Sequence, residues 1–170
     1  MNDRQTNRRG RIELYLLRHA DAGDPEAWTR PDAERPLSAK GRRQAERLGR
    51  HLASIQFTPD TILTSPKVRA AETARIVAEA LGRDVTEDDR LAGALDIAGV
   101  DAIIRDAGNN RRVVLVGHDP DFSDVLSTLV VAPSLSLRKG ALARVDLDPP
   151  IQPGGGVLRW LLPPDLLPSG

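Results

Sequence analysis

The feature that most constrains the fold is an apolar run at residues 14–17 that ends abruptly in Arg18, His19 and Asp21. A strand this rich in large apolar side chains suits a central position in an open α/β sheet, where helices cover both faces. Ligands of such sheets bind just beyond the carboxyl ends of the strands. The run therefore predicts that Arg18 and His19 lie at the functional edge, although a histidine at a strand end is also commonly a hydrogen-bonded structural residue.

Composition excludes several functions for this chain of 170 residues, which has the length of one ordinary domain. Lys and Arg number 24, as do Asp and Glu, so we expect no general attraction to nucleic acid or anionic membranes. The absence of cysteine excludes a disulfide, a thiol nucleophile and cysteine-bound zinc, and the few aromatics argue against base stacking. No apolar run approaches the ~20 residues of a membrane helix or forms an export signal, which predicts a cytoplasmic protein.

The chain divides into a single domain with two short flanking segments. Residues 1–11 are polar and basic and predict a disordered lead-in, residues 12–162 form the domain, and residues 163–170 are expected to be a tail. The polar loop at 22–36 contains one large apolar residue, Trp28, which we expect to cover the core; the alternative is the rim of the site. Ser38 is the expected N-cap of the helix that follows. Gly41 on the apolar face of this helix predicts a close approach of two backbones.

A second strand, at 61–64, leads into Ser65 and Pro66, which are typical of an N-cap and a first helical position. This helix is expected to end at Gly82. Arg69 lies one turn into it, where a cation is unfavourable for the helix dipole. Either Glu72 compensates this charge or a bound anion does, since helix N-termini and guanidinium groups both attract phosphate.

A third place where a strand ends in polar residues resembles the first. An apolar strand at 111–117 is followed by His118, Asp119 and Pro120. A helix is expected to follow, and a short edge strand at 84–91 and a helix at 99–107 are expected before it. Residues 141–147 and 157–162 predict an antiparallel pair of strands at the edge of the sheet.

Parallel strands bring their carboxyl ends to one edge of the sheet. The side chains that follow them, Arg18, His19, Arg69 and His118, are therefore expected to converge. Such a cluster does not suit a metal ion, because the arginines repel a cation and no carboxylate is clearly placed to offset them. It suits a tetrahedral anion such as phosphate. Without a serine–histidine or cysteine pair, the expected nucleophile is an imidazole.

At this point the chain resembles the histidine phosphatase (phosphoglycerate mutase-like) superfamily, and within it the small SixA-like phosphohistidine phosphatases. The resemblance runs in order from about residue 12 to residue 162, and several separated motifs make it more specific than any one of them. The residues that carry it are 16–22, 35–38 with Gly41, 64–66 with Arg69, Ala70 and Thr73, 116–118 with Pro120, 140–143, and Trp160.

The resemblance implies a three-layer α/β/α fold with a mostly parallel sheet and an antiparallel C-terminal edge. It implies that His19 takes the phosphoryl group, while Arg18, Arg69 and His118 bind the phosphate oxygens. His19 should be neutral, with its other ring nitrogen donating to a backbone carbonyl, and His118 should act as a protonated donor once the anion is bound. No cofactor and no metal are implied, and the expected partner is a phosphorylated substrate.

Two departures from the family concern the substrate. Larger members carry a glutamate acid where this chain has residues 91–96 without one, which leaves Asp96 or Asp119 as candidates. Asp119 is either the proton donor or a helix cap. The stretch from Thr73 to His118 is also too short for an inserted lid. Both departures favour phosphohistidine on a protein; the alternatives are a broad phosphomonoesterase of small metabolites and a phosphate-binding module without turnover.

Overall fold

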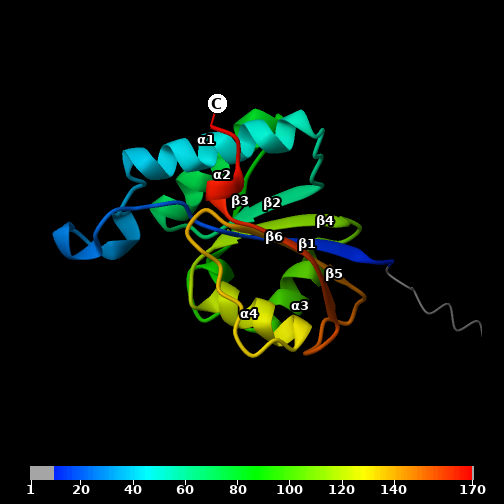
Figure 1. Ribbon diagram of the computed structural model, residues 1–170. Coiled ribbons are helices and arrows are strands. Elements are labelled where there is room, and N and C mark those ends of the chain that lie inside the picture. The colour runs from blue at the N-terminus through cyan, green and yellow to red at the C-terminus, as the bar shows by residue number, and fades with distance from the viewer. Residues whose placement is uncertain (1–9, 170) are drawn as a thin grey trace, which may run out of the picture.

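A six-stranded sheet forms the middle of three layers in the computed structural model, which describes residues 10–169 (Figure 1). The strand order is β3 (Thr86–Glu87), β2 (Thr61–Thr64), β4 (Arg112–Gly117), β1 (Ile12–Arg18), β5 (Leu142–Leu147) and β6 (Gly156–Leu162). The first four strands are parallel, and β5 and β6 form the antiparallel edge. The predicted fold class is confirmed. The predicted disordered lead-in falls mostly on residues 1–9, outside the described residues.

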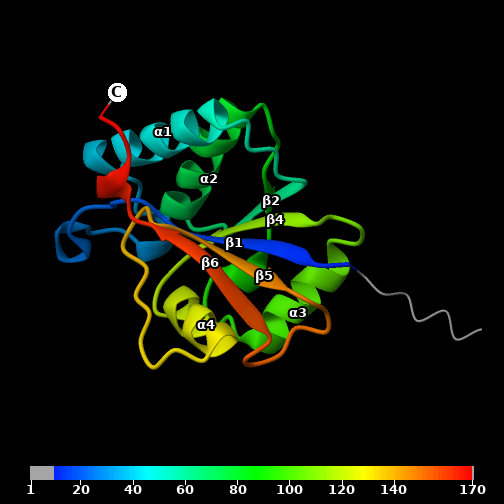
Figure 2. The same ribbon diagram turned by 45° about the vertical axis from the view of Figure 1, so that its right-hand side comes forward.

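Helices cover both faces of the sheet. Figures 1 and 2 show α1 (Ala39–Ser54) and α2 (Val68–Leu81) on one face, and α3 (Ile97–Asp106) and α4 (Asp121–Val130) on the other. Strand β1 serves both layers, because successive side chains point to opposite faces. Leu14 and Leu16 join the core with α3 and α4, while Tyr15 and Leu17 join the core with α1 and α2.

The start of α1 is as the sequence predicts. The Gly41 N–H donates to the Ser38 side-chain oxygen at 3.0 Å, so Ser38 is the N-cap. A Cβ at position 41 would lie 1.9 Å from the Asp21 carbonyl oxygen, which explains the glycine on the apolar face. The helix thus packs against the turn that follows β1. Gly82 ends α2 in the left-handed conformation, with φ of 61°, also as predicted.

Two local predictions are wrong. Helix α2 begins at Val68 rather than at Pro66 and has Lys67 at its N-cap position, so Ser65 lies before the helix; its hydroxyl contacts His118 and accepts from the Lys67 N–H. Trp28 joins neither core; it is half-buried, and its Nε1 donates to the carbonyl of Pro31 within the 22–36 loop.

The segment after β6 contributes to the fold. Pro164 and Leu167 are buried, and Leu167 joins the core beneath α1 and α2. Arg47 of α1 donates to the carbonyl oxygens of Leu167 and Pro168. Residues 163–169 therefore pack along α1.

Candidate active site

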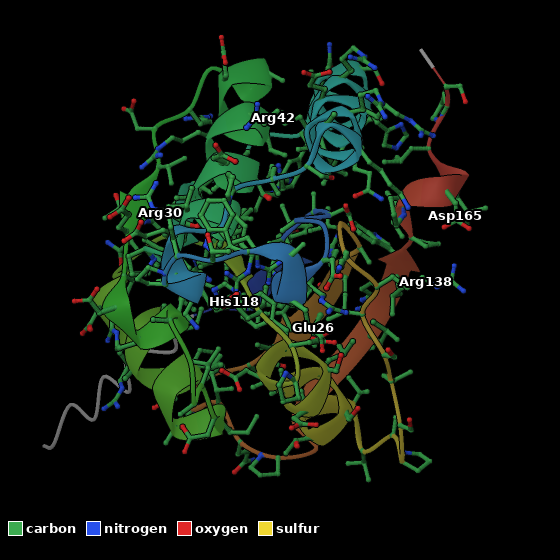
Figure 3. The ribbon with its side chains drawn as sticks, turned by 90° about the vertical axis from the view of Figure 1, so that its left-hand side faces the viewer. Glu26, Arg30, Arg42, His118, Arg138 and Asp165 are labelled. Carbon is green, nitrogen blue, oxygen red and sulfur yellow. The ribbon has the colours of Figure 1, made fainter. Side chains whose placement is uncertain are left out.

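The carboxyl ends of three parallel strands bring the predicted residues together. The His19 N–H donates to the Gly117 carbonyl at 2.9 Å, and the Ser65 N–H donates to the Val116 carbonyl at 2.9 Å. These bonds hold the ends of β1, β2 and β4 side by side. The rings of His19 and His118 are 5.3 Å apart between centroids, and both residues are buried. From the side of the strand ends, the 22–36 loop crosses in front of this site (Figure 3).

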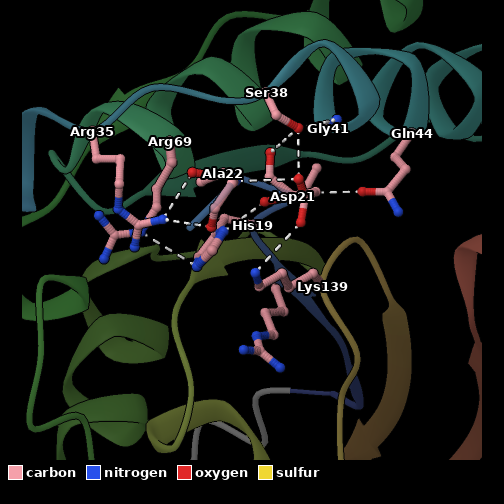
Figure 4. A network of polar contacts seen from close by, with 12 residues as sticks. His19, Asp21, Ala22, Arg35, Ser38, Gly41, Gln44, Arg69 and Lys139 are labelled. Atoms are coloured by element: carbon pink, nitrogen blue, oxygen red, sulfur yellow. Dashed lines mark hydrogen bonds and ion pairs between the residues drawn. The ribbon is translucent and has the colours of Figure 1, made fainter. Parts of the chain in front are cut away.

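Two contacts fix the tautomer of His19. Its Nδ1 lies 2.7 Å from the Ala20 carbonyl oxygen, which can only accept, so Nδ1 carries the proton. Arg69 Nε donates to the opposite ring nitrogen, Nε2, at 3.4 Å (Figure 4). The lone pair of Nε2 therefore faces Arg69 inside the site. This is the orientation that an imidazole nucleophile needs.

Burial keeps His19 neutral. The pKa of His19 is lowered from 6.5 to about 4; desolvation is the largest cause, the charges of Arg69, Arg18 and Lys139 act in the same direction, and the hydrogen bond to Ala20 opposes them. The sequence predicts a neutral His19. The structure adds that the main cause is the burial of the ring.

The turn that carries His19 is braced from two sides. Thr73 Oγ1 accepts from the Ala20 N–H at 3.1 Å and donates to the Arg69 carbonyl at 2.7 Å. The Gly140 N–H donates to the carbonyl oxygens of Arg18 and His19 at 3.1 and 3.0 Å. Helix α2 and the approach to β5 thus hold the turn with His19 in place.

Arg69 is paired with Asp32, which the sequence does not indicate. Its guanidinium donates to the Asp32 carbonyl at 2.8 Å and to the Asp32 carboxylate at 2.9 Å. The same carboxylate accepts from Arg35 Nε at 2.9 Å. Glu72 lies elsewhere, where it accepts from the Leu37 N–H and pairs with Arg42, so the proposed pairing of Glu72 with Arg69 is wrong. The 22–36 loop aims Arg69 at His19.

Burial also keeps His118 neutral. Its pKa is lowered from 6.5 to about 3, mainly by desolvation and also by the nearby His19, Arg69 and Lys67. Its Nε2 lies 2.7 Å from the Ser65 hydroxyl oxygen, while its Nδ1 is buried without a partner in the described residues. When the Ser65 hydroxyl donates to Nε2, Nδ1 carries a proton and is a free donor for an anion. His118 can therefore donate a hydrogen bond to an anion as a neutral imidazole, without the second proton that would make it an imidazolium cation.

Arg18 supplies a second donor without a partner. Its Nη1 donates to the Leu137 carbonyl at 2.8 Å and pairs with Asp119 at 3.2 Å, while Nε is buried and has no partner in the described part of the chain. Buried polar atoms are usually satisfied, so the unpaired donors Arg18 Nε and His118 Nδ1 are open to an additional acceptor. Together with the guanidinium of Arg69 they form a set of donors that suits an anion.

Comparison with known proteins agrees with this geometry. The model of the histidine phosphatase superfamily (branch 1) matches residues 14–94. An uncharacterized protein of Picosynechococcus sp. is 31% identical over 137 residues, covering 77% of this chain and 82% of that protein. The chain belongs to the histidine phosphatase superfamily. The "Probable phosphoglycerate mutase GpmB" of Salmonella choleraesuis is 32% identical over 111 residues, covering 62% of this chain and 51% of that protein, so the chain spans about half its length.

Solved structures show the same fold. The protein histidine phosphatase SixA complexed with tungstate aligns with a TM-score of 0.79 at 23% identity, covering 91% of this chain and 98% of that one. The mycobacterial glucosyl-3-phosphoglycerate phosphatase aligns with a TM-score of 0.68 at 19% identity, covering 88% of this chain and 98% of that one. The fold is therefore shared by phosphatases whose named substrates differ.

The two candidate acids of this histidine phosphatase are engaged in different ways. Asp96 is exposed, and its side chain caps α3 by accepting from the Gly99 N–H at 2.8 Å. Asp119 lies at the site, where one oxygen accepts from the Ser123 N–H and the other from the Ser123 hydroxyl at 2.7 Å and from Arg18. Both oxygens of Asp119 thus accept from protein donors, which matches a cap and a brace for Arg18.

Two further features, a metal site and a membrane span, are absent from the described residues. Among residues 10–169, no group of three His, Cys, Asp or Glu side chains is placed to hold a metal ion. No helix in this range is both long and apolar enough to traverse a bilayer.

The buried imidazoles of this phosphatase make a prediction about pH. We expect nuclear magnetic resonance titration of the ring nitrogens to show that His19 and His118 stay neutral down to about pH 5. An exposed histidine, by contrast, has a pKa of about 6.5. Because the unfolded chain takes up protons there and the folded chain does not, stability should fall as the pH drops from about 6.5 towards 4. Ring shifts that titrate near 6.5 would show that the site is hydrated and would contradict the assignment.

Proposed function

We propose that this histidine phosphatase hydrolyses phosphohistidine on a protein partner, with His19 as the nucleophile. The observation that carries the proposal is the fixed tautomer of His19, with Nδ1–H bound to the Ala20 carbonyl and the Nε2 lone pair beside Arg69. A neutral imidazole in this position can attack phosphorus directly.

The reaction has two steps. His19 Nε2 attacks the phosphorus, the bond between phosphorus and the partner's imidazole breaks, and the released ring nitrogen takes a proton from water. A second water then attacks the phosphorus on His19, which releases inorganic phosphate and restores the neutral imidazole. Arg18, Arg69 and the His118 Nδ1–H are the donors that stabilise the phosphoryl oxygens in both transfers.

The state of the nearby carboxylates supports phosphohistidine as the substrate. Asp32 is bound to Arg35 and Arg69, and Asp119 to Arg18 and Ser123. An alkyl phosphate needs an acid to protonate its leaving oxygen, whereas phosphohistidine releases an imidazole, which is a better leaving group. A site whose carboxylates already accept from other residues suits the second substrate.

The course of the chain supports a protein substrate. The stretch between α2 and β4 is taken up by β3, the 3-10 turn Asp89–Leu91 and α3, and α3 lies on the face of the sheet away from α1 and α2 (Figure 1). No inserted lid arises from this stretch, so a phosphorylated side chain on another protein can reach the site. We also propose that the reaction takes place in the cytoplasm, with which a chain free of cysteine is compatible.

The test compares a phosphohistidine carrier protein with a panel of sugar phosphates, for wild type and Asp119→Asn. We expect wild type to have a kcat/KM for the carrier protein at least about 100-fold above that for any sugar phosphate, since loss of general acid catalysis costs ~10²–10⁴-fold. Asp119→Asn should reduce both activities by a similar factor, because it loosens Arg18. A selective loss of ester hydrolysis would make Asp119 the acid and favour the small-metabolite phosphatase.

A further inference from the structure

A strongly basic cavity adjoins the candidate active site. Its volume is about 550 Å³, and it lies between the first half of α1, the approach to β5 and the 3-10 turn Pro164–Leu166. This volume is in the range of ligand-binding pockets. The cations that line it are Arg18, Lys40, Arg43, Arg47, Arg138 and Lys139.

The carboxylates in the cavity are already paired. Asp21 lies 3.4 Å from Lys139 and also accepts from the Ser38 hydroxyl at 2.6 Å, while Asp165 lies 3.6 Å from Arg138. Lys40 and Arg43 are exposed and make no ion pair or hydrogen bond with any described residue. The cavity therefore holds uncompensated positive charge, although the chain as a whole has a formal net charge of zero.

The stability of α1 does not explain why cations stand at these positions. Lys40 and Arg43 lie near the start of α1, whose first turn contains no acidic residue. A cation in the first turn of a helix opposes the helix dipole, so Lys40 does not stabilise the start of α1. Lys40, Arg43 and Arg47 also follow a spacing that places them on one stripe of the helix, facing the cavity. The stability of the helix therefore does not explain why this stripe is basic.

The cavity shares Arg18 with the candidate active site. Arg18 lines it and also carries the unpaired Nε in the active site. Asp21, two residues after His19, accepts from Lys139 on one side, and its N–H donates to Gln44 of α1 on the other (Figure 4). A substrate with its phosphoryl group at His19 would extend over these side chains.

We propose that this cavity is a second anion subsite, which binds acidic side chains of the phosphoprotein next to its phosphohistidine. The inference rests on the proposed function and names a feature of its substrate. The cations come from separate elements, and the unpaired ones lie exposed, one turn apart. A compact second phosphate needs donors that converge on one point, whereas carboxylates spread over a protein surface match spread charges.

The test uses two phosphohistidine peptides that differ only in their flanks, one rich in Glu and one with Gln in the same places. We expect Lys40→Gln/Arg43→Gln to lower the ratio of kcat/KM for the acidic over the neutral peptide by about tenfold, as two exposed charge pairs allow. The effect should appear in KM and shrink at high salt. The matched control is Arg50→Gln, which removes an exposed cation of α1 that does not line the cavity, and it should retain the wild-type ratio.

A second measurement separates this inference from the proposed function. The unphosphorylated Glu-rich peptide should inhibit hydrolysis of phosphoramidate, a small substrate, by wild type, and Lys40→Gln/Arg43→Gln should weaken this inhibition about tenfold. This result can be obtained even if neither phosphopeptide is hydrolysed, which would refute the proposed function alone. Three results would overturn the acidic subsite. The first is that the double variant lowers kcat/KM equally for both phosphopeptides, and the second is that the Glu-rich peptide inhibits it as strongly as wild type. The third result is that wild type prefers sugar bisphosphates over monophosphates and the double variant loses this preference.

Discussion

His19→Ala is expected to abolish formation of a phosphoenzyme and to lower kcat by about 10⁴-fold or more, since removing a nucleophile costs up to roughly 10⁶-fold. The reason is that the Nε2 lone pair beside Arg69 belongs to the only imidazole in the described site whose other nitrogen is fixed as a donor to a backbone carbonyl. Brief exposure of the wild type to a labelled phosphodonor such as phosphoramidate, followed by an alkaline quench, should place the label on His19.

The third histidine of the chain provides the control. His51 lies in the last turn of α1, and His51→Ala should be labelled like wild type. Label that persists in His19→Ala would assign the nucleophile to another residue. Wild type that binds tungstate but never becomes labelled would favour the phosphate-binding module.

Gly41→Ala is expected to produce the largest loss of stability of any single methyl addition considered, about 3 kcal/mol, because overpacking against atoms that cannot rotate away lies at the upper end of its usual cost. The added Cβ would lie 1.9 Å from the Asp21 carbonyl oxygen and 2.9 Å from the Asp21 nitrogen. Moving this turn also moves Ala20, which orients His19, so kcat should fall together with the urea midpoint.

Gly99→Ala is the matched control for this change. Gly99 lies three residues after the N-cap of α3, as Gly41 does in α1, and both donate an N–H to the capping side chain. An added Cβ at Gly99 would meet the flexible end of Leu95 at 3.0 Å. Alanine there should be neutral or stabilise the helix by up to ~1 kcal/mol. Equal stabilities for the two variants would refute the backbone contact at Gly41.

The local pattern of the chain determines which residues reach the site. The apolar runs at β1, β2 and β4 require central strands, and parallel central strands end at one edge. Arg18 ends β1, His19 and His118 directly follow β1 and β4, and Arg69 lies in the first turn of α2, after β2. Their meeting therefore needs only the order of the elements, which is why the sequence predicts it. The roles of these residues in catalysis remain for the labelling and substrate experiments to test.

Contacts that depend on the path of a loop are decided only by the tertiary structure. Asp32 lies on the exposed 22–36 loop, 37 positions before Arg69, and no periodicity indicates that it rather than Glu72 neutralises that arginine. Ser65 looks like a helix cap in sequence, but the neighbouring end of β4 brings His118 within 2.7 Å of its hydroxyl.

The depth of burial is likewise a tertiary property. The same imidazoles would titrate near 6.5 on a loop in water, and desolvation among packed helices, more than neighbouring charge, lowers their pKa values. The sequence by itself thus determined which segments form strands along the chain and which residues stand at their ends, because hydrophobic periodicity is a local property. The structure decided the partners, the protonation states and the basic cavity, because these depend on how distant segments exclude water from one another.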